Sequence, residues 1–252
     1  MSDDGDRWVV AIRPAEPAAR LRLICLAYAG GSPDMFRAWS AGVTPDVELL
    51  TLRLPGHGKR IKEKPYQHWD TLVADVYAAL APYLAAPHAF YGHSFGGRLA
   101  YELVHRAKKD HLDGTRRLFV SGCRSPDVPQ VRPYMHELDL AGFCDALRHM
   151  GGTPAEFLDT PGVRDLLLPV VREEIRLAEL WTDWHGQPVD VPITAMYGID
   201  DPVDTRAAMS GWASFTTRGA ELLEMPGGHF FPDTHLSDLL KAIDRRIGAG
   251  DG

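Results

Sequence analysis

The most specific chemical pattern in this chain is centred on Ser94. Residues 92–96 read Gly-His-Ser-Phe-Gly, after a short apolar run that ends at Tyr91 and before apolar residues at helical spacing. Strand, sharp turn and helix form the context in which Gly-x-Ser-x-Gly presents a nucleophilic serine. Such a turn strains the serine backbone, and side chains two positions to either side would collide with strand and helix. The pattern predicts Ser94 as a nucleophile, with a helix-capping serine in an ordinary turn as the alternative.

A serine hydroxyl needs a base within hydrogen-bond reach, and that base needs an acid to orient it. Where this turn occurs, the order along the chain is serine, acid, histidine. His229 lies in Pro-Gly-Gly-His-Phe-Phe at 226–231, between the last predicted strand and the last predicted helix. A histidine in that loop would lie at the carboxyl edge of the sheet, above the serine. We therefore expect His229 to be the base.

The acid should follow the preceding strand, where residues 197–204 read Tyr-Gly-Ile-Asp-Asp-Pro-Val-Asp. Asp201 is the preferred candidate, because Pro202 stiffens the turn behind it. Asp200 remains an alternative, since it directly precedes Asp201 in the same turn. Asp204 is expected to cap the helix that follows.

Acyl transfer also requires donors for the oxyanion of the tetrahedral intermediate. One should be the backbone N–H of Phe95, directly after the nucleophile, and the other should come from the loop after an early strand. Residues 28–31 read Tyr-Ala-Gly-Gly in such a loop, and its glycines would let the backbone approach a substrate closely. The N–H of Ala29 is the natural candidate, with a plain Gly-Gly turn as the alternative.

Other potential ligands and bases have simpler interpretations. His93 should point away from Ser94 and serve packing, and His57, in Pro-Gly-His-Gly at 55–58, should serve loop structure. The three cysteines lack metal-ligand spacing, and Cys25 lies in an apolar run typical of a buried thiol. We expect no metal and no cofactor.

The elements that must position these residues alternate between strands and helices. Strands are predicted at 7–12, 21–27, 47–52, 88–91, 117–122, 192–198 and 221–225. Helices are predicted at 69–84, 95–108 and 236–247, with a short helical segment near 36–39. This alternation predicts an α/β fold, a mostly parallel sheet with helices on both faces, in a single domain spanning 1–252.

The alternation stops between about residues 125 and 186, where only helices are predicted. They cover 137–150 and 163–184, with a turn from Pro154 between them, and Pro169 should kink or split the second. A helical insertion at this point is most simply a lid over the carboxyl ends of the strands, where such sheets bind ligands. About 60 residues would make a poor independent domain.

Composition narrows the classes of partner. Hydrophobic residues make up 45% and charged residues 24%, as in a soluble globular protein, and the net charge of -7 argues against nucleic acid or anionic membrane. The N-terminus lacks a secretory signal, and no apolar run approaches a membrane span. A cytoplasmic protein, monomeric and without a membrane partner, is expected.

Four motifs together resemble the type II (editing) thioesterases of polyketide and nonribosomal peptide biosynthesis, within the α/β-hydrolase superfamily. They are Leu-Ala-Tyr-Ala-Gly-Gly-Ser at 26–32, Leu-Pro-Gly-His-Gly at 54–58, Gly-His-Ser-Phe-Gly-Gly at 92–97 and Gly-Gly-His-Phe-Phe at 227–231. Gly-Gly-Thr-Pro at 151–154, inside the insertion, also matches the lid pattern of the family. The likeness covers nearly the whole chain; it departs at Ala27, where the family more often has proline.

The resemblance implies a stand-alone hydrolase that removes aberrant or short acyl groups from the phosphopantetheine thiol of acyl carrier or peptidyl carrier domains. It assigns Ser94 as nucleophile, His229 as base and Asp201 as orienting acid, with Ala29 and Phe95 as oxyanion donors. The lid would shape an apolar acyl chamber. The side chains expected to line it are Phe143, Leu147, Met150, Phe157, Leu167 and Leu168.

Two other functions are compatible with the same residues. One is a carboxylesterase or lipase that acts on oxygen esters, which a matched thioester and ester would distinguish. The other is a non-catalytic carrier-binding module that keeps the fold without hydrolysing anything. The presence of Ser94, Asp201 and His229 together argues against the second.

Overall fold

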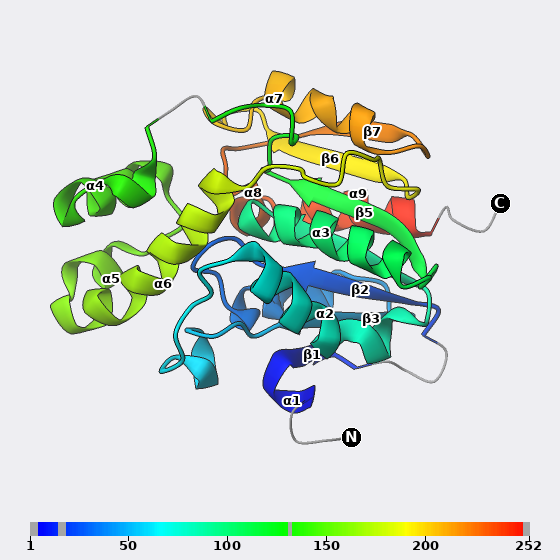
Figure 1. The fold of residues 1–252 in the computed structure, drawn as a ribbon, viewed down its shortest axis with the longest axis horizontal. Coiled ribbons are helices and arrows are strands. Elements are labelled where there is room, and N and C mark those ends of the chain that lie inside the picture. The colour runs from blue at the N-terminus through cyan, green and yellow to red at the C-terminus, as the bar shows by residue number, and fades with distance from the viewer. Residues whose placement is uncertain (1–4, 15–18, 131–132, 249–252) are drawn as a thin grey trace.

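The computed structural model describes residues 5–14, 19–130 and 133–248, and its centre is a seven-stranded sheet (Figure 1). The strands are β1 (Val9–Arg13), β2 (Leu21–Leu26), β3 (Val47–Leu52), β4 (His88–His93), β5 (Thr115–Ser121), β6 (Ile193–Gly198) and β7 (Ala220–Met225). They lie in the order β1-β3-β2-β4-β5-β6-β7, and all neighbours are parallel except β1 and β3. The predicted mostly parallel sheet is confirmed.

Strand side chains alternate between two apolar clusters, one on each face of the sheet. On β2, Ile24 and Leu26 belong to the cluster that includes helices α2 (Trp69–Leu84) and α3 (Phe95–Lys109). Leu23 and Cys25 belong to the opposite cluster, which includes the 3-10 helix η1 (Pro33–Ala41) and helix α9 (Leu236–Ile247). Burial of both faces explains why the strands read as apolar runs in the sequence.

The longer helices beside the sheet have the bounds that hydrophobic spacing predicted, whereas the N-terminal segment differs from its prediction as a strand. Helices α2 and α9 begin and end at the predicted residues, whereas Gly5–Trp8 form a short helix, α1, and β1 starts only at Val9. The predicted connection at 13–20 includes residues 15–18, which lie outside the described residues. The helix expected after Asp204 is present as α7 (Arg206–Ser210). Three short elements were not predicted, because single turns carry no hydrophobic period. They are η2 (Gly58–Arg60), η4 (Gly211–Phe215) and α8 (Phe231–Thr234).

Between β5 and β6 the described chain forms helices and no strand of the sheet. They are η3 (Met135–Glu137), α4 (Leu140–Met150), α5 (Ala155–Asp159) and α6 (Pro161–Leu180). Figure 1 shows α4 and α5 standing beside the sheet, with α6 leading back to it. We call 125–186 the helical insertion; its residues 131–132 lie outside the described residues. An apolar cluster of its own, which includes Phe143, Leu147 and Ile175, holds it together.

The sequence predicted that Pro169 kinks or splits helix α6. The helix does not split there. The helix is continuous from Pro161 to Leu180 with Pro169 inside it. A proline removes one helical hydrogen bond, but this proline is exposed while Leu168 and Val170 on either side are buried. Packing on both sides of the proline therefore keeps the helix in one piece.

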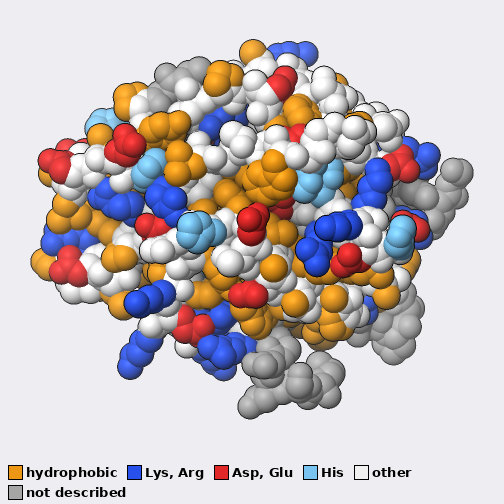
Figure 2. Space-filling view, viewed as in Figure 1, with side chains coloured by type: hydrophobic (Ala, Val, Ile, Leu, Met, Phe, Trp, Pro, Cys, Tyr) orange, Lys and Arg blue, Asp and Glu red, His pale blue; other side chains and the backbone are white. Residues whose placement is uncertain are grey.

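The surface mixes apolar and charged side chains. Figure 2 shows hydrophobic side chains interspersed with basic and acidic ones over the helical insertion at the left of the view. Leu140, Phe157 and Leu166 of the insertion are among the exposed large apolar residues. Across the described ranges, no helix combines the length and the apolar composition that crossing a membrane requires.

Candidate active site

Ser94 occupies a strained turn between β4 and α3. Its backbone angles are φ 53° and ψ -114°, in a region that non-glycine residues rarely adopt. Its amide donates to the carbonyl oxygen of Ser121 at the end of β5, at 2.8 Å, which anchors the turn to the sheet. Strain of this kind persists only where the surroundings enforce it, and it is concentrated at functional sites.

The glycines on either side of Ser94 are required by close backbone packing. A Cβ atom at Gly92 would lie 2.1 Å from the carbonyl oxygen of Gly96. A Cβ atom at Gly96 would lie 2.3 Å from the carbonyl oxygen of Leu26, on the neighbouring strand. Both distances are far inside van der Waals contact, and backbone atoms cannot move aside. The turn therefore admits no side chain at either position.

His229 and Asp201 form a buried hydrogen-bonded pair beside this turn. His229 follows β7 and Asp201 follows β6, and these strands are neighbours in the sheet. The Nδ1 atom of His229 lies 2.8 Å from Oδ2 of Asp201. Asp200 is exposed. Its backbone amide donates a hydrogen bond to the carbonyl oxygen of Gly227. The structure thus brings Asp201, and not Asp200, to His229.

The second oxygen of Asp201 is held by the backbone. Its Oδ1 accepts hydrogen bonds from the amides of Val203 at 2.8 Å and Asp204 at 3.1 Å. Burial alone would raise the pKa of Asp201, but the hydrogen bond and charge of His229 and these two amides hold the pKa below its ordinary value. A charged Asp201 accepts the Nδ1–H of His229, which leaves Nε2 as the basic nitrogen.

Ser94 and His229 line one small pocket. Within the described chain, the Ser94 hydroxyl takes part in no hydrogen bond. Hydrogen bonds between nucleophile and base are often loose without substrate and tighten when it binds. The arrangement is therefore compatible with proton transfer from Ser94 to Nε2 of His229.

Asp204 is a further part of the site that the sequence interpretation assigned elsewhere. The side chain of Thr205, not Asp204, caps helix α7 by accepting from the amide of Ala208. Asp204 is buried, with Oδ2 3.5 Å from Nδ1 of His229 and Oδ1 accepting from the amide of Arg124 at 2.8 Å. The prediction of a capping role is wrong, and His229 has a second carboxylate beside it.

The imidazole ring of His93 packs against that of His229. It is fully buried, its Nδ1 lies 2.9 Å from Oγ of Ser121, and its ring centroid is 5.0 Å from that of His229. Burial, reinforced by His229, holds the pKa of His93 well below its ordinary value. A neutral ring here, in the predicted packing role, does not oppose the positive charge that His229 would acquire as a base.

The two amides expected to bind an oxyanion are those of Ala29 and Phe95. In the described chain neither Ala29 N–H nor Phe95 N–H donates a hydrogen bond. Phe95 is the first residue of α3, so its amide also lies at the positive end of the helix dipole. The neighbouring loop amides are already used, since Gly31 donates to the carbonyl of Tyr28 at 2.8 Å and Gly30 donates to Glu174 at 2.7 Å.

Glu174 links helix α6 to this loop, a contact that the sequence did not suggest. One carboxylate oxygen accepts from the amide of Gly30, and the other lies 2.7 Å from Nε2 of His57. Burial lowers the pKa of His57, but the charge and hydrogen bond of Glu174 outweigh it and raise the pKa above its ordinary value. The role of His57 in loop structure therefore extends to the insertion. The available signal was an acidic residue on an otherwise apolar helix face.

The pocket above Ser94 is small, about 60 Å³. Its apolar walls come mainly from the helical insertion and include Met135, Leu147, Met150, Ile175 and Ala178. Of the predicted lining residues, only Leu147 and Met150 reach it. Phe143 and Leu168 lie in the core of the insertion, Leu167 is half-buried elsewhere and Phe157 is 39% exposed. Helical periodicity could not tell which apolar face met the sheet.

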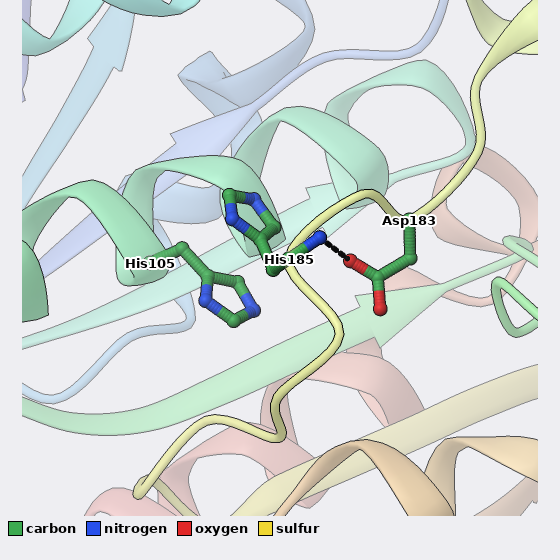
Figure 3. Close-up of side chains that lie close together, drawn as sticks. All are labelled: His105, Asp183 and His185. Carbon is green, nitrogen blue, oxygen red and sulfur yellow. Dashed lines mark hydrogen bonds between the residues drawn. The ribbon is translucent and has the colours of Figure 1, made fainter.

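Figure 3 shows another group of potential metal ligands, His105, Asp183 and His185. The two imidazole rings are stacked, with centroids 3.8 Å apart and planes 9° apart. Because the lone pair of an imidazole lies in the ring plane, parallel stacked rings cannot both direct a lone pair at one ion. His185 Nε2 also lies 2.8 Å from Oε2 of Glu102. The geometry fits ring stacking and hydrogen bonding better than metal ligation.

Comparison with known proteins adds a family to this geometry. Residues 21–247 match the sequence profile of the thioesterase domain. The chain is also similar to the AMB antimetabolite synthetase AmbE of Pseudomonas aeruginosa, with 35% identity over 240 residues. That match covers 95% of this chain and 11% of AmbE, a much longer protein.

Two solved structures extend the similarity to the whole fold. The type II thioesterase BorB from the borrelidin biosynthetic cluster has a TM-score of 0.87 and 30% identity, covering 96% of this chain and 98% of BorB. ClbQ from the colibactin NRPS/PKS pathway has a TM-score of 0.85 and 29% identity, covering 91% of this chain and 98% of ClbQ. Each likeness thus extends over more than nine tenths of this chain.

Proposed function

The chain belongs to the thioesterase domain family, and from that premise we propose that it hydrolyses acyl thioesters on the phosphopantetheine arm of acyl carrier or peptidyl carrier domains. It is a thioester hydrolase of the α/β-hydrolase fold. The proposed substrates are aberrant or short acyl groups on polyketide or nonribosomal peptide synthases. The kinship with BorB and with ClbQ of an NRPS/PKS pathway supports this assignment, and the buried His229–Asp201 pair beside Ser94 carries it.

In the proposed mechanism, Ser94 Oγ attacks the thioester carbonyl while Nε2 of His229 accepts the hydroxyl proton. The amides of Ala29 and Phe95 hold the oxyanion, and Asp201 stabilises the imidazolium. The carbon–sulfur bond breaks, the pantetheine thiol leaves with the proton from His229, and an acyl-serine remains. Water then attacks the acyl-serine, His229 takes the water proton and returns it to Ser94, and the carboxylic acid is released.

The pocket supports the choice of acyl group. At about 60 Å³ the pocket is much smaller than the roughly 300–1,000 Å³ of sites that take drug-sized ligands, which suits a short acyl chain. A long chain would require the helices of the insertion to move apart. The proposal therefore favours short acyl groups over long fatty acyl chains.

The proposal includes no metal ion or cofactor, because phosphopantetheine would arrive on the partner carrier. It also places the protein in the cytoplasm as a monomer. The thiols of Cys25, Cys123 and Cys144 are buried and unpaired, which suits a reducing compartment.

The test is acyl release from carrier proteins loaded with acetyl, propionyl and longer acyl groups, measured for the wild type and for Ser94→Ala. We expect hydrolysis to fall by about 10³-fold or more in Ser94→Ala. Intact mass spectrometry should find an acylated intermediate only on the wild type. Ser210→Ala, an exposed serine, is the matched control and should retain full activity.

Hydrolysis of a matched oxygen ester distinguishes the proposed thioesterase from a carboxylesterase or lipase. Wild-type protein that hydrolysed the oxygen ester faster than the carrier thioester would be an esterase instead. Protein that hydrolysed neither, and that a fluorophosphonate probe failed to label at Ser94, would be a non-catalytic binding module.

A further inference from the structure

Arg98 is a buried cation one helical turn beyond the nucleophile. It lies on α3, four residues after Ser94, and is 3% exposed. Arginine is almost never fully buried unless a carboxylate or a set of acceptors neutralises it, because taking an unpaired charge out of water is costly. The position of Arg98 therefore calls for an explanation.

Within the described residues, no carboxylate pairs with Arg98. Its Nε atom has no hydrogen-bond partner, and no described carboxylate lies within ion-pair distance of the guanidinium. Its guanidinium lies over the ring of Trp181, whose centroid is 5.8 Å from Cζ. A cation–π contact at that distance contributes weakly compared with an ion pair.

The nearby carboxylates are engaged elsewhere. Glu102, one turn further along α3, accepts from Trp181 Nε1 at 2.7 Å with one oxygen and lies 2.8 Å from His185 Nε2 with the other. Glu179 accepts from the amides of Met135 and His136 at 2.8 and 3.2 Å. Both acids are therefore satisfied without Arg98.

Arg98 lines the same small pocket as Ser94. The pocket has a second arginine, Arg124, in its wall, and its two wall carboxylates, Glu179 and Asp204, already accept hydrogen bonds from backbone amides. A group that enters this pocket from Ser94 therefore meets the guanidinium of Arg98, whose Nε has no hydrogen-bond partner, next to apolar walls.

We propose that Arg98 is a specificity-determining residue that binds a carboxylate at the far end of a short acyl chain. The substrates would be carboxyacyl thioesters, such as malonyl or succinyl groups, and the inference rests on the proposed thioesterase function. A guanidinium can hold a carboxylate with two parallel hydrogen bonds, and such pairs are stronger out of water. A neutral acyl chain of the same shape leaves the buried cation unpaired, as it is in the free protein.

The test compares four pantetheine thioesters in two shape-matched pairs. Malonyl is paired with isovaleryl, and succinyl with isocaproyl, so that each pair differs in a carboxylate against an isopropyl group. We expect wild-type kcat/KM to favour at least one carboxylated substrate over its neutral partner by about tenfold or more.

Substitution then assigns the preference to Arg98. Arg98→Met keeps an unbranched apolar stem without the guanidinium and should lower kcat/KM for the carboxylated substrate about 100-fold, while the neutral partner changes less than about threefold. Arg98→Lys keeps the charge without the planar guanidinium. Its kcat/KM for the carboxylated substrate should lie between the values of the wild type and of Arg98→Met. Arg106→Met, an exposed arginine on the same helix, is the matched control and should keep the wild-type ratio.

Three outcomes would overturn the inference. They are a wild type that prefers both neutral partners, an Arg98→Met variant that loses both members of a pair equally, and an Arg98→Met variant that keeps the wild-type ratio. Thermal unfolding checks that the variants fold, and if Arg98→Met does not, the wild-type preference and Arg98→Lys decide. The same four acyl groups are also loaded on a carrier protein. A wild type that releases none of them from pantetheine or from the carrier refutes the proposed function itself, whereas hydrolysis without the preference refutes only the role of Arg98.

Discussion

Two buried histidine–carboxylate pairs bear on the proposed active site, one beside Ser94 and one behind the loop of Ala29. They differ in the contacts that each pair makes. His229 lies 2.8 Å from Asp201, and His57 lies 2.7 Å from Glu174. In both pairs the side chains are less than a tenth exposed. Distance and burial alone therefore cannot tell a catalytic pair from a structural one.

The nitrogen that each histidine uses makes the difference. His229 meets its carboxylate through Nδ1, which leaves Nε2, at the tip of the ring, for the pocket that contains Ser94. His57 meets Glu174 through Nε2, so the tip of its ring is already occupied. The other oxygen of Glu174 holds Gly30, the residue after Ala29. One pair can move a proton, whereas the other positions the loop that carries an oxyanion donor.

The largest effect should come from breaking the pair that can move a proton. Asp201→Asn should lower kcat by about 10⁴-fold, because an amide can favour the wrong tautomer of His229. Asp200→Asn is the matched control and should stay within about twofold, because Asp200 is exposed. The measurement is steady-state hydrolysis of an acyl thioester. A larger loss in Asp204→Asn than in Asp201→Asn would assign the orienting role to Asp204.

A smaller effect should follow from weakening the positioning pair. Glu174→Gln should lower kcat about 10- to 100-fold with little change in KM, because the loop that it holds acts on the transition state, where one donor contributes about 3 kcal/mol. Glu173→Gln, on the same helix and paired with Arg176, should leave kcat within about twofold. An unchanged kcat, or a change confined to KM, would show that Glu174 does not position the oxyanion donor.

The smallest effect concerns stability and pH. The raised pKa of His57 means that folding favours its protonated form, so the pair with Glu174 stabilises the fold most at low pH. That contribution is full below the ordinary histidine pKa of about 6.5 and is lost as pH rises through the higher pKa of the folded state. His57→Gln should therefore lower the free energy of unfolding by about 1 kcal/mol near pH 6, and by less at higher pH.

Urea unfolding of the wild type and His57→Gln over a pH series measures this difference. Comparing the two proteins cancels the contributions of the other histidines to the pH dependence of stability. One of these is His93, whose pKa is lowered by burial, so that its contribution grows with pH. His68→Gln, an exposed histidine, is the control and should show no such trend. A difference that stayed constant or grew with pH would contradict the assignment of the ion pair to His57.

Local sequence determined much of this protein, wherever the physical constraint is itself local. Gly92 and Gly96 signal a turn in which no Cβ fits, and the structure shows backbone oxygens where those atoms would lie. Apolar runs and helical spacing predicted the parallel sheet and the bounds of α2 and α9, because burial on one or both faces leaves a periodic trace. Chain order placed Asp201 and His229 in loops at one sheet edge, since parallel strands end on the same side.

Only the tertiary structure decided which members of those loops meet. Pro202 favoured Asp201 in the sequence without excluding Asp200, and the direction of the turn buries Asp201 and exposes Asp200. Distant elements supply the partners of Glu174 and Asp204. Arg98 matters because its Nε has no partner in the pocket. No local sequence pattern encodes these contacts. The same holds for the pocket walls, because the packing of the insertion on the sheet, and not helical periodicity, selects the apolar faces that reach Ser94.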